Sequence, residues 1–317
     1  MKILITGGFG FVGGALGKYL WSRGHEILLG SRSVRHSPDW CPEAIPVITS
    51  WTDMESLVKV CEGVNCIIHA AGMNAPDCSN NSAEAIVANG LNTARLLQAA
   101  KKAGVQKFIY ISTAHVYSSS LGGIITEDSC PTNLHPYAMS HRIGEDSVLY
   151  ANQSGKINGV VFRLSNAFGV PACVDTDAWI LLVNDICRQS VTDSKIVLRS
   201  SGRQYRDFVG LNAVVQTIGK LAELNDQDKL GGVFNLGSGK SLSVLEMAEL
   251  VAARSKLLFG KELPIQKEDI DEKNPKNLTF SIDKITKSGL YTHSDLSKDI
   301  DELLHYCRRN FPTNDTK

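Results

Sequence analysis

The chain has 317 residues, of which 43% are hydrophobic and 21% charged, and its 33 basic side chains balance 33 acidic ones. This composition is typical of a folded protein with one large domain or two smaller ones, and it is too apolar for disorder. Nucleic-acid-binding domains are usually basic, whereas this chain has zero net charge, so we expect no nucleic-acid partner. No apolar run approaches the roughly 18 residues of a membrane span, so we expect no membrane partner.

The first half of the chain alternates short β-branched segments with longer segments that carry an apolar stripe of helical periodicity. Strands are predicted at 2–6, 26–30, 44–48, 66–69, 107–112 and 159–164, and helices at 11–23, 54–61, 83–103 and 137–152. Because parallel pairing needs a crossover connection, this alternation predicts an α/β protein with a doubly wound parallel sheet, the Rossmann fold. Such a sheet binds its ligand at the carboxyl ends of the strands, where the strand order reverses.

The second half has a looser rhythm. Helices are predicted at 177–189, 211–224, 244–253 and 295–309, short strands at 195–199 and 233–236, and a surface loop at 261–277. We therefore predict a dinucleotide-binding domain over residues 1–168. Residues 169–317 are predicted to form mainly a smaller C-terminal substrate-binding lobe, parts of which return to the Rossmann sheet.

A glycine-rich turn follows the first strand directly. Glycines at positions 7, 10 and 13 suit a tight turn, a close approach of backbone to pyrophosphate, and close helix–strand packing. Glycine clusters also form plain turns, but a strand before this one and a helix after it are the context that a phosphate site requires. We therefore predict that a dinucleotide binds at Gly7, Gly10, Phe11, Val12 and Gly13.

The end of the second strand bears on which dinucleotide binds. An NAD site usually has an acidic residue there for the ribose 2′-hydroxyl, whereas an NADP site offers arginine to the 2′-phosphate. This chain has Ser31, Arg32 and Arg35 at that point and no acidic residue. The pattern favours NADP(H) over NAD(H), because a guanidinium group forms charge-assisted hydrogen bonds with phosphate. The alternative is that both arginines are solvated loop charges.

Several ordered motifs extend over nearly the whole chain. They include a Thr-Ala-His-Val-Tyr segment at 113–117 and a Tyr-Ala-Met-Ser-His segment at 137–141. With the glycine turn, these segments resemble the extended short-chain dehydrogenase/reductase family, in particular its NAD(P)-dependent sugar epimerase/dehydratase branch. Further motifs that carry the resemblance lie at 69–72, 89–93, 163–169, 206–209 and 235–239.

The resemblance implies roles for individual residues. Tyr137 matches the catalytic tyrosine, which relays a proton to or from a sugar oxygen while hydride moves to or from the nicotinamide. Thr113 matches the residue whose hydroxyl group hydrogen-bonds the same oxygen. This acid–base work needs a phenol whose pKa lies below its usual value of about 10. The further cofactor-binding residues that the resemblance implies are Ala70, Ala71, Gly72 and Asn89.

The family has a lysine four residues after the tyrosine, where this chain has His141. In the family that lysine lowers the pKa of the tyrosine and grips the nicotinamide ribose. Spacing i, i+4 keeps His141 on the same helix face as Tyr137, but an imidazole with a pKa near ~6.5 is only partly charged at neutral pH. Three interpretations remain: a working enzyme with a modified relay, a slow or specialised enzyme, or a cofactor-binding protein without turnover. If His141 must be charged, kcat falls as the pH rises through about 6–7.

Other positions concern the substrate. The dehydratase branch has acidic residues directly after the catalytic threonine, where this chain has Ala114 and His115, so we do not expect a 4,6-dehydratase. His115 is a candidate substrate contact or simply a polar residue at a strand end. The resemblance implies that Asn166 and Arg206 hold the diphosphate of a nucleotide-linked sugar, although Arg206 is alternatively a structural partner of Asp207. Arg203, Gln204 and segment 175–179 are further candidates for sugar or base contacts.

These observations lead to three functional hypotheses. The first is an NADP-dependent reductase of a nucleotide-linked keto-sugar. The second is a nucleotide-sugar epimerase that retains NAD, and the third is a cofactor-binding protein with little or no turnover. The helices at 83–103 and 137–152 match those through which many family members dimerise, so a homodimer is expected. The eight cysteines include no CxxC pair, which is typical of reduced thiols in the cytoplasm, and we expect no metal site.

Overall fold

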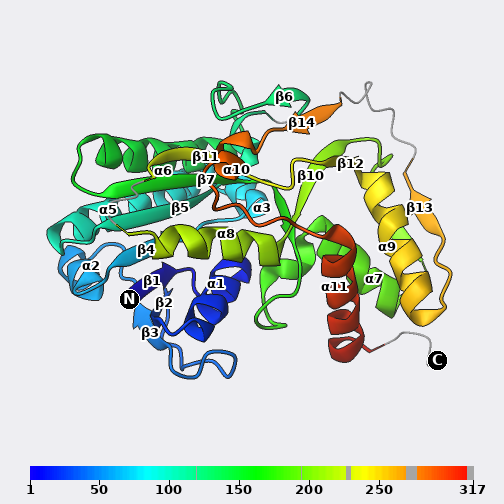
Figure 1. The fold of residues 1–317 in the computed structure, drawn as a ribbon, viewed down its shortest axis with the longest axis horizontal. Helices are drawn as coiled ribbons and strands as arrows, with labels where there is room; N and C mark the ends of the chain where they lie inside the picture. The colour runs from blue at the N-terminus through cyan, green and yellow to red at the C-terminus, as the bar shows by residue number, and fades with distance from the viewer. Residues whose placement is uncertain (119, 194, 226–229, 269–276, 313–317) are drawn as a thin grey trace.

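Seven parallel strands form the centre of the molecule (Figure 1). The computed structural model describes residues 1–118, 120–193, 195–225, 230–268 and 277–312. The strands follow the order β11-β7-β5-β4-β1-β2-β3, so the strand order reverses between β1 and β4. Their bounds are β1 (Lys2–Thr6), β2 (Glu26–Ser31), β3 (Ile45–Ile48), β4 (Cys66–His69), β5 (Lys107–Thr113), β7 (Asn158–Leu164) and β11 (Gly232–Leu236). The predicted doubly wound Rossmann sheet is confirmed.

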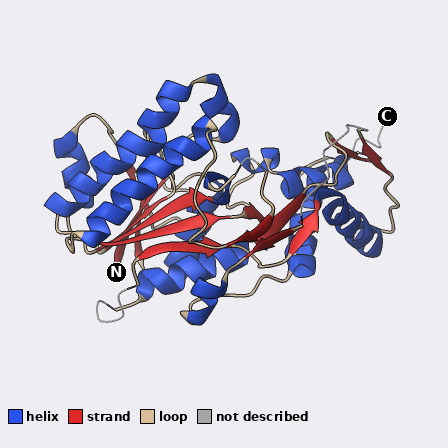
Figure 2. Ribbon diagram, turned by 90° about the horizontal axis from the view of Figure 1, so that it is seen from above, coloured by secondary structure: helices blue, strands red, loops and turns tan. Residues whose placement is uncertain are grey.

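Helices cover both faces of this sheet (Figure 2). Successive strand residues point to opposite faces, so Ile3 and Ile5 pack in one apolar cluster while Leu4 packs in another. The first cluster includes side chains of α1 (Phe11–Ser22) and α8 (Leu211–Glu223). The second includes side chains of α2 (Met54–Cys61), α5 (Asn92–Lys102) and α6 (Pro136–Gln153).

The single helix predicted at 83–103 is wrong in detail. The structure has α3 (Ala75–Asn80), α4 (Ser82–Ala85), a π-helical turn η1 (Ile86–Leu91) and then α5. In this turn, a Cβ atom on Gly90 would lie only 2.8 Å from the Cγ2 atom of Ile143 on α6. Close packing of η1 against α6 therefore accompanies the local change of helical pitch, which apolar periodicity alone does not reveal.

The C-terminal half forms a smaller lobe beside the sheet and also returns to it. Its apolar core joins α7 (Leu182–Thr192), α9 (Val244–Phe259) and α11 (Leu296–Asn310). Strand β11 was predicted at 233–236 and adds to the edge of the large sheet beside β7. The helix predicted at 177–189 is instead a 3-10 turn η3 (Asp177–Ile180) followed by α7.

Short strands complete the lobe. The predicted loop at 261–277 contains β13 (Ile265–Lys267), while its residues 269–276 lie outside the described residues. No helix in the described ranges is both long and apolar enough to cross a membrane.

The remaining short elements of the described chain are η2 (Ala114–Val116), β6 (Gly123–Ile125), β8 (Asn166–Phe168), β9 (Ile196–Leu198), β10 (Tyr205–Gly210), β12 (Ser241–Ser243), β14 (Leu278–Phe280) and α10 (Asp283–Lys287).

Candidate active site

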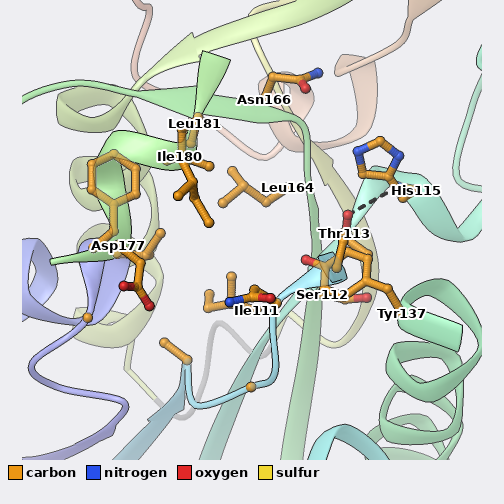
Figure 3. A pocket seen from close by; sticks show the side chains of 18 of the residues that line it. Ile111, Ser112, Thr113, His115, Tyr137, Leu164, Asn166, Asp177, Ile180 and Leu181 are labelled. Carbon is orange, nitrogen blue, oxygen red and sulfur yellow. Dashed lines mark hydrogen bonds between the residues drawn. The ribbon is translucent and has the colours of Figure 1, made fainter. Parts of the chain in front are cut away.

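A cavity of about 560 Å³ lies at the carboxyl ends of β1, β4, β5 and β7, which is where a doubly wound sheet is expected to bind its ligand (Figure 3). Most of the residues singled out in the sequence line it, although they come from six separate segments. They are Gly7, Gly10, Phe11, Val12, Gly13, Ala70, Ala71, Gly72, Thr113, His115, Tyr137, His141, Asn166 and Arg206.

The glycine turn forms one wall of the cavity, and its backbone leaves no room for side chains. Gly7 has a φ of +67°, and a Cβ atom there would lie 2.8 Å from the carbonyl oxygen of Ala70. A Cβ atom on Gly13 would lie 2.2 Å from the carbonyl oxygen of Gly7. Helix α1 begins after Gly10 without a side-chain cap, so the N–H groups of its first turn remain available to an anion. This cradle fits the pyrophosphate of a dinucleotide.

Ser31 at the end of β2 and the two arginines that follow it lie outside this cavity. Ser31 is half-buried, and its carbonyl oxygen accepts hydrogen bonds from the backbone and side chain of Thr49. Arg32 and Arg35 are exposed, and the Arg35 guanidinium lies 5.7 Å from the ring centroid of Phe9. Their exposure is compatible both with solvated loop charges and with contacts to a 2′-phosphate.

Asn89 is buried behind the cavity wall and does not line it. Its Oδ1 atom accepts a hydrogen bond from the backbone N–H of Met73 at 2.7 Å, and its Nδ2 atom donates to the Oγ atom of Ser140 at 2.9 Å. Asn89 thus fastens the segment after β4 to helix α6. Asn89 therefore affects the cavity indirectly, because it holds the segment of Gly72 and Met73, which line the cavity, against α6.

Thr113 and Tyr137 meet in the cavity from different elements (Figure 3). Thr113 ends β5, and its Oγ1 atom accepts a hydrogen bond from the backbone N–H of His115. Tyr137 lies in the first turn of α6, where the side chain of His135 caps the helix. Burial raises the pKa of Tyr137, and a hydrogen bond with Thr113 opposes that rise. The pair therefore combines a protonated phenol with a hydroxyl group that favours its ionised form.

His141 packs directly against Tyr137, with 4.7 Å between the ring centroids. Burial, assisted by nearby His115, lowers the pKa of His141 to about 4. The imidazole is therefore neutral at physiological pH, and the interpretation in which a charged His141 assists Tyr137 is not supported. A fall of kcat through about pH 6–7 is no longer expected from this residue.

The substrate candidates line the same cavity. Asn166 lies on β8 and donates from its Nδ2 atom to the carbonyl oxygen of Asp207. Arg206 and Asp207 are neighbours on β10, so their side chains point to opposite faces. The Asp207 carboxylate accepts hydrogen bonds from Ser165 and Ser238, while Arg206 lines the cavity.

His115 lies near Thr113 and Tyr137, with 6.4 Å between its ring centroid and that of Tyr137. Desolvation, followed by the positive charge of Arg206, lowers the pKa of His115, which favours the neutral imidazole. Its ring faces the cavity beside Thr113 in Figure 3. A neutral imidazole can both donate and accept a hydrogen bond there.

The structure adds residues that the sequence pattern did not predict. Segment 180–183 forms an apolar wall, and Asp177 from the candidate segment 175–179 lines the cavity near it. Tyr110 lies behind the cavity under His141, and its position inside a buried strand carries no sequence signal for a polar role. Arg203 and Gln204 are exposed and do not line the cavity.

A glycine turn at the reversal of strand order, opposite a threonine–tyrosine pair, defines a nicotinamide-dependent enzyme of the short-chain dehydrogenase type. The chain belongs to the NAD dependent epimerase/dehydratase family, whose model matches residues 3–237. This match confirms the resemblance found in the sequence.

Three individual relatives are distant in sequence but cover nearly the full chain. An uncharacterised UDP-glucose epimerase of Bacillus subtilis is 26% identical over 96% of this chain and 92% of its own length. The structure of a Bacillus cereus UDP-glucuronic acid 4-epimerase with UDP-glucuronic acid and NAD superposes with a TM-score of 0.82 at 20% identity, covering 98% of this chain and 100% of that one. The structure of RMD from Pseudomonas aeruginosa with NADPH gives a TM-score of 0.78 at 22% identity, covering 97% and 99%.

Proposed function

We propose that the protein transfers hydride between a nicotinamide dinucleotide and a ring carbon of a nucleotide-linked sugar. One observation carries the proposal: the cavity lined by the glycine turn also contains the side chains of Thr113 and Tyr137. A bound dinucleotide would supply the hydride acceptor or donor. Gly7, Gly10 and the first turn of α1 would hold its pyrophosphate, beside the wall formed by 70–72.

In this proposal Tyr137 moves the proton of the reacting sugar hydroxyl, and Thr113 hydrogen-bonds the same oxygen. Because burial raises the pKa of Tyr137, the phenol needs help to ionise. His141 is neutral and supplies no positive charge, so Thr113 and the bound ligands must favour the phenolate. The chemistry is therefore general acid–base catalysis with a hydrogen-bonded tyrosine in place of one activated by lysine.

We propose NAD(H) as the cofactor and epimerisation as the reaction. The epimerase relative and the NAD-containing epimerase structure support this choice. The NADP-dependent reductase predicted from the sequence remains a second candidate, favoured by the exposed Arg32 and Arg35 beside the carboxyl end of β2. The NADPH-containing neighbour is compatible with it. The two candidates differ in whether turnover consumes the cofactor.

A nucleotide diphosphate sugar is the proposed substrate. Arg206 supplies a guanidinium fork, and Asn166 supplies an amide group, both suited to a doubly charged diphosphate. His115 would contact the sugar, since its ring lines the cavity and its centroid lies 6.4 Å from that of Tyr137. The names of the relatives support UDP-linked sugars such as UDP-glucose and UDP-glucuronic acid.

We also propose a homodimer through the faces of η1, α5 and α6. Four large apolar side chains are exposed on η1 and α6: Ile86, Leu91, Ile143 and Tyr150. Ile143 packs over Gly90, so the two helical segments present a joint surface. Burying these side chains against a second copy would remove apolar area from water. Analytical ultracentrifugation of the purified protein tests this, with Ile143→Glu expected to give the monomer.

The catalytic proposal is tested with purified protein, UDP-glucose and UDP-glucuronic acid. We expect the sugar to change configuration with NAD⁺ present and without net change in nicotinamide absorbance. Net consumption of NADPH with keto-sugar nucleotides would favour the reductase instead. Arg206→Ala should weaken binding of the nucleotide sugar, while Arg203→Ala is the exposed control. Absence of all conversion, together with unchanged ligand binding in Tyr137→Phe and Arg206→Ala, would overturn the proposal.

A further inference from the structure

A buried tyrosine lies directly behind His141. The Oη atom of Tyr110 is 2.8 Å from the Nδ1 atom of His141, and Tyr110 is only 1% exposed. Helix α6 makes room for this hydroxyl group with Gly144, where a Cβ atom would lie 2.6 Å from the Tyr110 oxygen. Any other residue at position 144 would displace the hydroxyl group or the helix. The contact between Tyr110 and His141 is therefore built into the packing of β5 against α6.

The direction of this hydrogen bond follows from the acceptors that the phenol can reach. Burial raises the pKa of Tyr110 well above its usual value, so the phenol keeps its single proton. The phenol also lies near two other acceptors. The carbonyl oxygen of Asn89 is 3.4 Å away, which is long for a hydroxyl donor, and the hydroxyl oxygen of Thr93 already lies 2.9 Å from the Nε2 atom of His69. That carbonyl oxygen already accepts a hydrogen bond from the Oγ1 atom of Thr93 at 2.6 Å. The phenol proton therefore points to Nδ1 of His141.

A neutral imidazole that accepts at Nδ1 must carry its proton on Nε2. The Nε2 atom lies 3.8 Å from the position of a Cβ atom on Gly72, at the wall of the cavity. Within the described residues, no protein group hydrogen-bonds this Nε2 atom. The ring thus presents one N–H donor to the cavity, close to the ring of Tyr137.

We propose that Tyr110 is a positioning residue that fixes His141 in the Nε2–H tautomer, so that a neutral imidazole donates a hydrogen bond to the nicotinamide ribose. The donor role rests on the proposed function, whereas the tautomer rests on the protein alone. Without Tyr110, the two neutral tautomers would differ less in energy, and the donor would be present only part of the time. Position 141 would then keep one property of the family lysine, a fixed donor, without its charge.

The tautomer is measurable by long-range proton–nitrogen NMR on protein labelled with nitrogen-15 histidine, with His141→Gln assigning the signals. We expect a protonated Nε2 and an unprotonated Nδ1 in the wild-type protein. Tyr110→Phe should shift the His141 signals toward a mixture. The matched control is Tyr117→Phe, which removes a buried hydroxyl group that donates to Asn235. A protonated Nδ1 in the wild-type protein, or unchanged signals in Tyr110→Phe, would overturn the positioning role.

Titration with NAD⁺ tests the donor role separately. If Tyr110→Phe lowers the population of the Nε2–H tautomer to about one half, NAD⁺ binding should weaken by about twofold, because the affinity falls in proportion to the population of the competent state. Tyr117→Phe should bind NAD⁺ as the wild-type protein does, and His141→Gln should bind it more tightly than His141→Val, because glutamine keeps a neutral donor. Equal affinity in Tyr110→Phe and the wild-type protein would overturn the donor role. The expected tautomer in a protein that binds no NAD⁺ would support the positioning role and reject the proposed function.

Discussion

A buried ion pair joins Glu145 on α6 to Arg163 on β7, and removing one of its partners tests how much this contact contributes to stability. The Nη2 atom of Arg163 lies 2.8 Å from the Oε2 atom of Glu145, and their side chains are 3% and 0% exposed. Ser112 adds a hydrogen bond of 2.6 Å to the other carboxylate oxygen. Replacing Glu145 by glutamine would leave the Arg163 charge buried without a counter-charge.

Breaking a buried pair by removing one partner costs about 3–5 kcal/mol. The entropy of unfolding is about 2 cal/mol/K per residue, so for 317 residues this loss lowers Tm by about 4–8 °C. Urea unfolding and calorimetry of Glu145→Gln measure both values. A double variant, Glu145→Leu with Arg163→Met, should recover most of the stability, because replacing both partners leaves no buried charge.

The same helix supplies the matched control. Asp146 pairs with Arg142 at 3.0 Å, but their side chains are 60% and 38% exposed. An exposed pair contributes less than about 1 kcal/mol, so Asp146→Asn should change the unfolding free energy little. If Glu145→Gln destabilises the protein no more than Asp146→Asn does, the argument from burial is refuted.

Three further predictions concern the site and the C-terminal lobe. Tyr137→Phe should lower turnover by about 10²–10⁴-fold in a steady-state assay while NAD⁺ affinity stays within about twofold, and unchanged turnover would remove Tyr137 from the mechanism. Because burial raises the pKa of Tyr137, and a base must lose its proton to act, kcat for sugar oxidation should rise between about pH 7 and 9. A fall between about pH 6 and 7 would instead reinstate a charged His141. Burial raises the pKa of Asp299 to about 6, so its protonation adds stability that is fully present below about pH 4 and lost as the pH rises through 6. Asparagine does not titrate, so the unfolding free energy of Asp299→Asn relative to that of the wild-type protein should rise by about 2–3 kcal/mol between about pH 4 and 8, as measured by urea unfolding. A difference that stays constant with pH would contradict this reasoning.

Much of the fold follows from local sequence patterns. β1 and β4 have their predicted bounds, because each is a short run rich in β-branched residues that is followed at once by glycine or alanine. The glycines at 7, 10 and 13 also predict their own geometry, since a turn this tight admits no side chain. The family resemblance further predicts Thr113 and Tyr137 as partners, although 24 positions separate them in the numbering of the chain.

Only the tertiary structure determined which side chains of the site are charged and which are neutral. The sequence identifies His141 at the lysine position but leaves its charge open, because the pKa of an imidazole depends on burial and on neighbours from other elements. The contact with Tyr110 joins α6 to a strand whose apolar pattern gives no hint of a polar role. Asn89 likewise belongs to a family motif, yet its side chain is buried behind the lining of the cavity and does not reach the cavity itself. Local sequence determined which residues carry the chemistry, and long-range packing determined their protonation, their tautomer and which of them reach the cavity.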